Sequence, residues 1–338
     1  EAATEKAKDL IRMSVARARF LEPLQEFNLP VNKVAIVVGG GIGGMISALS
    51  IANQGHEVHL IEKESELGGT AKKLHYTIEG LDVQTYLREL KNKVYQNTFI
   101  HVYTDAVITE TTGYVGNFVT KVKSEKGISE IKHGAAVIAI GADVYKPTEY
   151  LYGEDDRVMT HLELEEEITN RNEKIMKAKN LVMIQCVGSR NEERNYCSKI
   201  CCSESVKNAL KLKEINPDLD IYILFRDMRT YGFKEDYYRM AADKNVKFIR
   251  YEPEDKPQVE PGESEDGRPV LKVTVIDYVL GAKVEIDADI IALAAAIVPS
   301  ASSQEVSKLF KFSLGPDGFC QEAHVKLRPV DFAAAGVY

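Results

Sequence analysis

The sequence predicts an α/β fold with two Rossmann-like nucleotide-binding domains, the second of them degenerate. Three observations support this prediction. Apolar strands alternate with amphipathic helices in two blocks, which begin near residues 33 and 179. The first block carries a G-x-G-x-x-G turn directly after its first strand, and each block ends in an apolar strand followed by a proline.

Composition limits the function classes. The chain has 338 residues, 44% of them hydrophobic, which is enough for one large core or two moderate ones. The net charge of −8 argues against a nucleic-acid partner, which needs a basic face. There is no apolar run near the ~20 residues of a membrane span and no secretory signal. We therefore predict a cytoplasmic protein that does not span a membrane.

The chain starts at Glu1 rather than Met and stops at Tyr338, within what reads as a strand. We expect it to be a piece of a longer polypeptide. In such a cytosolic chain, clustered cysteines favour a metal or redox role over a disulfide framework.

The N-terminal segment, residues 1–30, is expected to form a helix packed on the domain surface, closed by Pro23 and Pro30. Its apolar residues recur at helical spacing: Leu10, Ile11, Val15, Ala18, Leu21 and Leu24.

The first block reads as a βαβ unit over residues 33–64, followed by strands at 99–103, 117–124 and 135–142. Residues 151–178 are charged and are expected to form an exposed helical connector. The second block is predicted to run strand 179–189, helix 203–216, strand 220–227, helix 234–245, strand 246–251, a polar loop at 252–269, and alternating strands at 270–280 and 283–299.

These blocks suggest four parts. They are an N-terminal helical segment (1–30), a dinucleotide-binding domain (31–150), a degenerate NAD(P)-type domain carrying the cysteines (151–300) and a return to the first domain (301–338).

The glycine turn has the context that a dinucleotide site needs. Gly39 permits the tight turn, Gly41 lets the backbone approach a pyrophosphate, and Gly44 lets the helix pack on the strand. Glu62 ends the next strand and is placed to accept hydrogen bonds from a ribose 2′-OH, which disfavours NADP. The alternative is a glycine-rich turn in an unrelated α/β protein.

The continuation favours FAD over NAD. The pair Gly68–Gly69 follows the acid, and Gly141 ends a strand that resembles the A-T-G strand end of two-dinucleotide flavoproteins, with Ile140 in place of the threonine. The predicted FAD-binding residues are Gly39, Gly41, Gly43, Gly44, Glu62, Lys63, Gly68, Gly69, Thr70, Val107, Gly141 and Ala142.

The second block has cysteines where a second glycine motif would be expected. Only Gly188 lies in this loop, which argues against NAD(P) binding there, whereas Cys186, Cys197, Cys201 and Cys202 fall within it. A vicinal disulfide at 201–202 would leave the other two cysteines unexplained. Adjacent cysteines are poorly placed to chelate one zinc ion. A [4Fe–4S] cluster takes four thiolates on four separate irons. The remaining alternative is four buried cysteines without a ligand, and Cys320 is expected to be a free thiol.

Four segments carry a family resemblance, namely residues 39–69, 182–214, 225–251 and 322–338. Together they resemble the A subunit of heterodisulfide reductase and its bacterial relatives, over nearly the whole chain. The cysteine segment, QCVGSRNEERNYCSKICCSES, is the most specific part.

The resemblance implies a thioredoxin-reductase-like flavoprotein, an FAD domain with an inserted degenerate pyridine-nucleotide domain. It implies a [4Fe–4S] cluster held by Cys186, Cys197, Cys201 and Cys202. It further implies electron transfer, with bifurcation as one mode, between a hydrogenase or dehydrogenase donor and disulfide-reducing subunits in anaerobic metabolism. A homodimer is a further candidate assembly.

The resemblance also suggests roles for single residues. Lys207 would approach the flavin N5 and shift its potential as the catalytic residue, the alternative being a solvated helix lysine. His324, Lys326 and Arg328 would line the isoalloxazine, whereas Arg226, Arg229 and Lys234 are interpreted as surface charge. The chain lacks the ferredoxin-type cysteine motifs usual in full-length members.

Three function classes follow. The first is an FAD/[4Fe–4S] electron-transfer subunit. The second is a pyridine nucleotide–disulfide oxidoreductase that uses NAD(P)H directly, and the third is a scaffold without cofactor.

Overall fold

The structure is a computed structural model that describes residues 2–23 and 28–338. It divides into two compact units, Glu1–Val31 and Asn32–Tyr338. The first unit contains the predicted helix, α1 (Ala2–Ala18), with Glu5 in its first turn and Arg17 in its last, as the helix dipole favours. Leu24 lies outside the described residues, and the packing of this helix on a domain stays a prediction.

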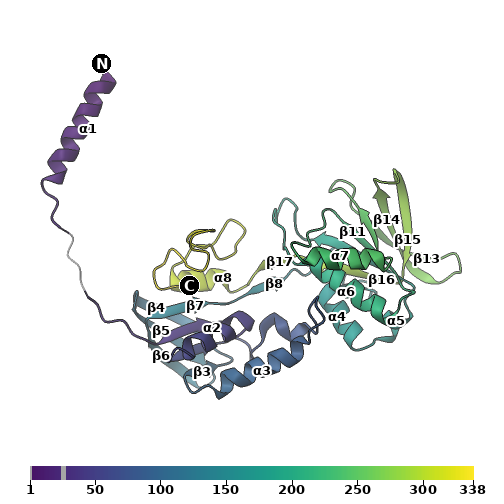
Figure 1. Ribbon diagram of the computed structural model, residues 1–338, viewed down its shortest axis with the longest axis horizontal. Helices are drawn as coiled ribbons and strands as arrows, with labels where there is room; N and C mark the ends of the chain where they lie inside the picture. The colour runs from purple at the N-terminus through teal and green to yellow at the C-terminus, as the bar shows by residue number, and fades with distance from the viewer. Residues whose placement is uncertain (1, 24–27) are drawn as a thin grey trace. The chain divides into compact units, whose positions relative to one another are not determined.

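The second unit begins with a parallel sheet that follows from the predicted βαβ pattern (Figure 1). Its strand order is β3-β2-β1-β7: β3 (Ile100–Tyr103), β2 (Val58–Ile61), β1 (Ala35–Val38) and β7 (Ala135–Ile138). Successive β1 side chains enter opposite cores, because Ile36 and Val38 pack on one face and Val37 on the other.

Two layers cover this sheet. On one face lie α2 (Ile42–Ala52), the 3₁₀ turn η1 (Gly69–Lys73) and α3 (Val83–Gln96), whose Asp82 cap accepts a hydrogen bond from the Thr85 N–H. The other core includes residues of an antiparallel sheet: β4 (Val107–Tyr114), β5 (Asn117–Ser124) and β6 (Gly127–His133).

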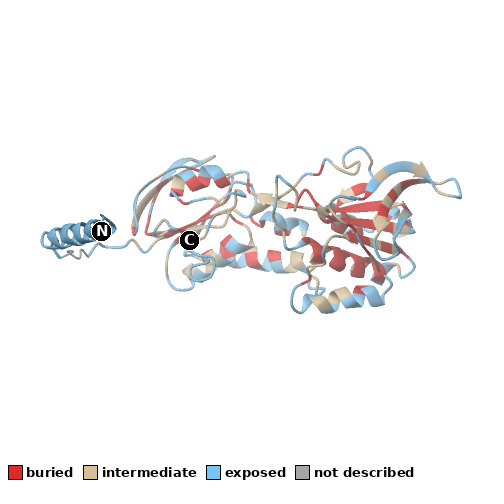
Figure 2. Ribbon diagram, turned by 90° about the horizontal axis from the view of Figure 1, so that it is seen from above, coloured by how far each residue is buried: buried red, intermediate tan, exposed pale blue. Residues whose placement is uncertain are grey.

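The chain then passes through a two-stranded connection into a second parallel sheet. Strand β8 (Ala142–Val144) pairs with β17 (Ile297–Pro299). The second sheet has the order β12-β11-β10-β16-β9, comprising β12 (Lys247–Arg250), β11 (Asp220–Phe225), β10 (Asn180–Val187), β16 (Ile290–Ala295) and β9 (Val158–Thr160). Buried residues concentrate in its strands and in the helix faces against them (Figure 2).

The remaining elements surround this second sheet. Its helices are α4 (His161–Thr169), α5 (Glu173–Lys177), α6 (Cys201–Ile215) and α7 (Lys234–Asp243). A second antiparallel sheet contains β13 (Gln258–Glu263), β14 (Pro269–Asp277) and β15 (Ala282–Ala288). After α8 (Ser303–Phe310), the chain returns to the first sheet, where Val337 pairs with Ala136 beside β7.

Two predictions about elements are wrong. Residues 151–178 are not an exposed connector, because β9 joins the sheet and Leu164 and Ile168 of α4 are buried in its core. The charged residues of α4 occupy its other faces and obscure that apolar stripe. The polar segment 252–269 contains β13, which pairs with β14 along its length. Among the described residues, no helix is long and apolar enough to cross a membrane.

Candidate functional site

The cysteine loop leaves the carboxyl end of β10, the edge at which open parallel sheets bind their ligands. The register of β10 against β16 shifts between Ile184 and Val187, and Cys186 adopts a positive φ of 61°. Such irregularities redirect a side chain from its regular alternation, at a cost in backbone strain. Arg190 and Lys199, in the same loop, also have positive φ.

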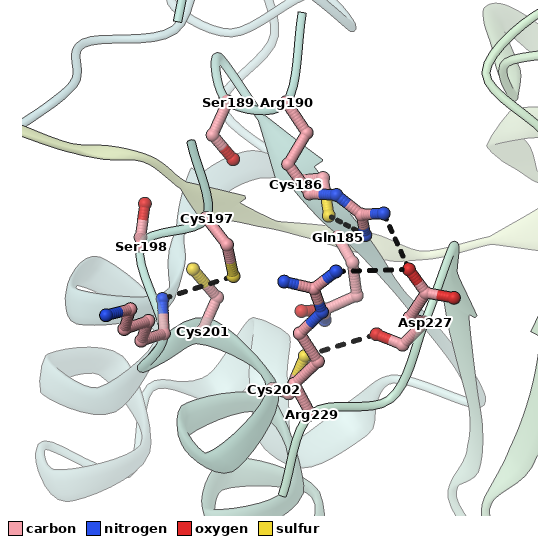
Figure 3. Close-up of a pocket in the computed structure, with 11 residues that line it drawn as sticks. Gln185, Cys186, Ser189, Arg190, Cys197, Ser198, Cys201, Cys202, Asp227 and Arg229 are labelled. Carbon is pink, nitrogen blue, oxygen red and sulfur yellow. Dashed lines mark hydrogen bonds and ion pairs between the residues drawn. The ribbon is translucent and has the colours of Figure 1, made fainter. Parts of the chain in front are cut away.

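The four predicted cysteine ligands line one cavity (Figure 3). Cys186 comes from the end of β10, Cys197 from the loop, and Cys201 and Cys202 from the first turn of α6. The partial positive charge of a helix N-terminus favours thiolates there. All five cysteines of the chain are free thiols in this structure, and Cys320 lies apart from the cavity.

Each of these four sulfurs has a nearby donor. Cys186 Sγ lies 3.9 Å from the Arg190 guanidinium, and Cys197 Sγ accepts the Lys199 N–H at 3.3 Å. The Arg229 guanidinium also donates to Cys197. The Arg229 N–H donates to Cys202, and the Ser198 hydroxyl donates to Cys201. Donors aimed at sulfur support the thiolate form, which is the form that binds metals.

Burial acts in the opposite direction on the free thiols. Desolvation raises the pKa of Cys201 to about 12 and also raises the pKa of Cys186 and of Cys202. A bound cationic centre would reverse this preference, because a coordinating thiol is deprotonated by the metal charge. Among the described residues, no group of three or more His, Cys, Asp or Glu side chains is arranged to hold a single metal ion.

Gly188 packs against the ring of Tyr145. A Cβ added there would lie 2.2 Å from Cδ1 of Tyr145, and its φ is +74°. Arg194 stacks over the same Tyr145 ring and donates to the Gly188 carbonyl at 2.6 Å. This glycine therefore accommodates an aromatic ring close to the loop backbone.

The first glycine turn has a different environment. A Cβ on Gly39 would lie 2.3 Å from the Ala139 carbonyl oxygen, and one on Gly44 would lie 1.8 Å from the Gly39 oxygen. In contrast, a Cβ on Gly41 or Gly43 would meet nothing within 4 Å. The turn is therefore tightly packed at Gly39 and Gly44 and open at Gly41 and Gly43. The open positions lie at the N-terminus of α2, where backbone N–H groups attract phosphate.

Glu62 lies under this turn, at the end of β2. It is 6% exposed, and its carboxylate accepts the Gly40 N–H at 2.6 Å and the Glu64 N–H at 2.9 Å. Each carboxylate oxygen can accept a further hydrogen bond. Glu62 therefore fixes the turn directly, and a ribose hydroxyl would be an additional donor.

The other predicted FAD residues are spread around the turn. The Gly68 N–H donates to the Gly40 carbonyl oxygen, and a Cβ on Gly69 would lie 3.3 Å from the Gly41 Cα, so these two backbone segments run together. Thr70 lines a cavity described below. Lys63, Val107 and Gly141 are exposed and Ala142 is half-buried, and no contact of theirs identifies a ligand.

A second cavity, of about 340 Å³, is large enough for part of a cofactor. Thr70, Leu74 and Tyr76 line it from the first block, and Glu204 and Lys207 line it from α6. Lys207 is 8% exposed, so the alternative of a solvated helix lysine is wrong. Its ammonium is paired with Glu165 and lies 3.3 Å from the Tyr76 carbonyl oxygen.

Glu204 has an unusual position in this cavity. Its Oε1 has no hydrogen-bond partner among the residues that the structure describes, and desolvation raises the pKa of its carboxyl to about 7.

Sequence reasoning missed the charged groups at the cysteine cavity. Arg190, Asp227 and Arg229 line it, and the surface-charge interpretation of Arg229 is therefore wrong. Arg226 is half-buried and donates to the Arg190 carbonyl oxygen at 2.7 Å. In the sequence, only the spacing of Arg190, four residues after Cys186, indicated that a charged side chain could lie near a cysteine.

His324, Lys326 and Arg328 are exposed and line neither cavity.

Comparisons with known proteins agree with this architecture. The NAD(P)-binding Rossmann-like domain family matches residues 37–96. The thioredoxin reductase of Lactococcus lactis superposes with a TM-score of 0.59 at 15% identity, covering 90% of this chain and 88% of that one. The predicted thioredoxin-reductase-like α/β fold is thus confirmed.

Sequence relatives extend over the whole chain. One iron-sulfur A subunit of the CoB–CoM heterodisulfide reductase of Methanopyrus kandleri is 32% identical, covering 99% of this chain. The A subunit of the H₂:CoB-CoM heterodisulfide,ferredoxin reductase of Methanothermobacter thermautotrophicus is 31% identical, covering all of it. The chain spans 64% of the length of each of these relatives. Along its whole length, this chain is similar in sequence to the A subunits of these heterodisulfide reductases.

Proposed function

We propose that the chain is an FAD- and [4Fe–4S]-binding electron-transfer subunit, an oxidoreductase component of a heterodisulfide-reductase-like complex. The observation that carries this proposal is the cysteine cavity, where four sulfurs converge and each faces an N–H or O–H donor. Four thiolates are the ligand set of a [4Fe–4S] cluster, and hydrogen bonds to the sulfurs are a usual feature of such sites.

FAD binding is supported by the glycine turn and by the fold. The open positions at Gly41 and Gly43 leave the N-terminus of α2 free to receive a pyrophosphate. We propose that the predicted FAD-binding residues, from Gly39 to Ala142, contact the cofactor. The flavin would supply two-electron chemistry and pass single electrons onward.

The residues of the second cavity would act on the flavin ring. In this proposal Lys207 directs its positive charge at the ring, held in place by Glu165. Tyr76 lies below the ammonium, with its ring 4.9 Å from Nζ. Replacing Lys207 with Ala should lower the flavin potential, and an unchanged potential in a folded variant would remove this role.

The names of the relatives support partner subunits for this chain. Their names describe subunits of multi-subunit reductases, and we infer disulfide-reducing subunits and a hydrogenase or dehydrogenase donor as partners. Electron bifurcation, a cytoplasmic location, a homodimer and the four-part domain division belong to the same proposal.

The runner-up is a pyridine nucleotide–disulfide oxidoreductase, the activity class of the superposed thioredoxin reductase. It requires a phosphate cradle in the second sheet. The position that a second glycine loop would use is filled by the Tyr145 ring against Gly188, which favours the first proposal.

Anaerobic purification followed by iron and flavin assays tests the proposal. We expect flavin bands and about four irons per chain, with iron lost in Cys202→Ser and retained in Cys320→Ser. Flavin without iron after anaerobic cluster reconstitution would favour the runner-up, and a protein that binds neither under these conditions would favour a scaffold.

A further inference from the structure

We propose that Asp227 is a positioning residue that holds two guanidinium groups, those of Arg190 and Arg229, against the cysteine sulfurs, and that this triad sets the reduction potential of the cluster. The inference rests on the proposed function, because it needs a cluster in the cysteine cavity.

One carboxylate oxygen organises the triad (Figure 3). Asp227 Oδ2 lies 2.6 Å from Nη2 of Arg190 and 3.5 Å from Nη2 of Arg229. The other Arg190 nitrogen, Nη1, is the one that lies 3.9 Å from Cys186 Sγ. The Arg229 guanidinium donates to Cys197. Each arginine therefore joins the same carboxylate to a different cysteine.

The backbone brings the three residues of the triad to the same edge of the second sheet. Arg190 belongs to the cysteine loop, and Asp227 and Arg229 follow β11, the strand beside β10. The Asp227 carbonyl oxygen lies 3.6 Å from Cys202 Sγ, and the Arg229 N–H donates to that sulfur. The segment 227–229 therefore contacts the cavity through both its backbone and its side chains.

The three charged side chains of the triad differ in their exposure to solvent. The side chain of Arg190 is 19% exposed, that of Arg229 is 33% exposed and that of Asp227 is 46% exposed. Solvent therefore screens the carboxylate most and Arg190 least. The two guanidinium groups contact the sulfurs, and the Asp227 carboxylate contacts the guanidinium groups.

This order determines the sign of each effect. Reduction adds negative charge to the cluster, which nearby cations and N–H···S donors stabilise and a nearby anion opposes. Loss of either guanidinium should lower the reduction potential. Asp227→Asn keeps a hydrogen-bond acceptor for the arginines but removes the opposing charge, so the potential should rise.

The opposite signs separate electrostatic tuning from simple structural support. If the triad only held the loop together, breaking it at either end would loosen the same cavity and move the potential in one direction. A surface pair on the same sheet, Lys247 with Asp220 at 2.8 Å, provides the control. It lies at the amino ends of β11 and β12, away from the cysteine loop.

The experiment is an anaerobic potentiometric titration of the cluster-loaded full chain, followed by electron paramagnetic resonance, with iron content measured for every variant. Arg190→Gln and Arg229→Gln should each lower the reduced-to-oxidised ratio at a fixed potential about tenfold, equivalent to about 59 mV for one electron. Arg190→Lys should recover part of the shift. Asp227→Asn should shift the ratio in the opposite direction, and Lys247→Gln should leave it unchanged.

Two further results are decisive. Higher salt should reduce the Asp227→Asn shift more than the Arg190→Gln shift, because the carboxylate is more exposed. Equal potentials in all variants with full iron content, or shifts of one sign, would overturn the inference and leave the proposed function intact. A wild-type chain that binds no iron after reconstitution would overturn both.

Discussion

Lys207 of α6 and Glu165 of α4 form an ion pair in which the lysine side chain is 9% exposed and the glutamate side chain is fully buried. Glu165 also accepts the backbone N–H groups of His75, at 2.5 Å, and Tyr76, at 3.2 Å. One buried carboxylate thus joins two helices of the second sheet to a segment that follows the first glycine turn. Removing either partner would leave the other charge buried and unpaired.

Lys207→Ala should therefore lower the free energy of unfolding by about 3–5 kcal/mol, measured by urea denaturation. The double variant Lys207→Met with Glu165→Gln should lose less than the sum of the single changes, because it removes both charges. Lys211→Ala, on the same helix, breaks an exposed pair with Glu214 and should cost at most about 1 kcal/mol. Equal losses at Lys207 and Lys211 would contradict the buried pair.

Gly44 and Gly43 form a matched pair in the first turn of α2. A Cβ at position 44 would overlap the Gly39 carbonyl oxygen, whereas one at position 43 meets open space. Gly44→Ala should destabilise the fold by at least about 1–3 kcal/mol, and Gly43→Ala should be neutral or slightly stabilising, since alanine favours the helix. Thermal unfolding of the two variants compares them directly, and equal melting temperatures would oppose this account.

Gly188 should tolerate substitution poorly because of Tyr145. Gly188→Ala places a Cβ against the ring in a backbone with φ of +74°, so both a clash and backbone strain oppose it. Gly232→Ala, at a φ of +64° with no atom near the added Cβ, carries only the strain of about 1–2 kcal/mol. Combining Gly188→Ala with Tyr145→Ala should recover part of the loss in urea denaturation. No recovery would mean that the ring does not fill this position.

Because His133 is buried in its neutral form, we expect the free energy of unfolding to fall in acid. His133 is fully buried, with Nε2 2.8 Å from Thr120 Oγ1, and desolvation lowers its pKa to about 4. Since the unfolded pKa is about 6.5, the neutral side chain contributes fully above pH 6.5. That contribution falls by up to about 3 kcal/mol as the pH drops from 6.5 toward 4.

His133→Gln should reduce this acid dependence, because the variant has no group to protonate at that position. Urea unfolding at pH 7.5, 5.5 and 4.5, compared between wild type and variant, isolates the His133 contribution from that of other buried groups. Identical slopes for the two proteins would contradict it.

The sequence by itself determined the local features of this protein. The glycine turn after β1, the β1-α2-β2 unit, the alternation of β10, α6 and β11 and the clustering of four cysteines after β10 all follow from residues close together in the chain. Backbone preferences and apolar periodicity act over a few residues, so a linear pattern is sufficient to predict them.

Only the tertiary structure decided which charges meet. Arg190 and Asp227 are 37 positions apart and come together because β10 and β11 are parallel neighbours whose carboxyl ends share one edge. Glu165 and Lys207 are 42 positions apart and meet because α4 and α6 pack together. In the sequence, a charged residue on the surface cannot be distinguished from a charged residue in a cavity. Burial by distant segments separates the two cases, and for the same reason the charged sequence of α4 indicates an exposed helix although one of its faces is buried.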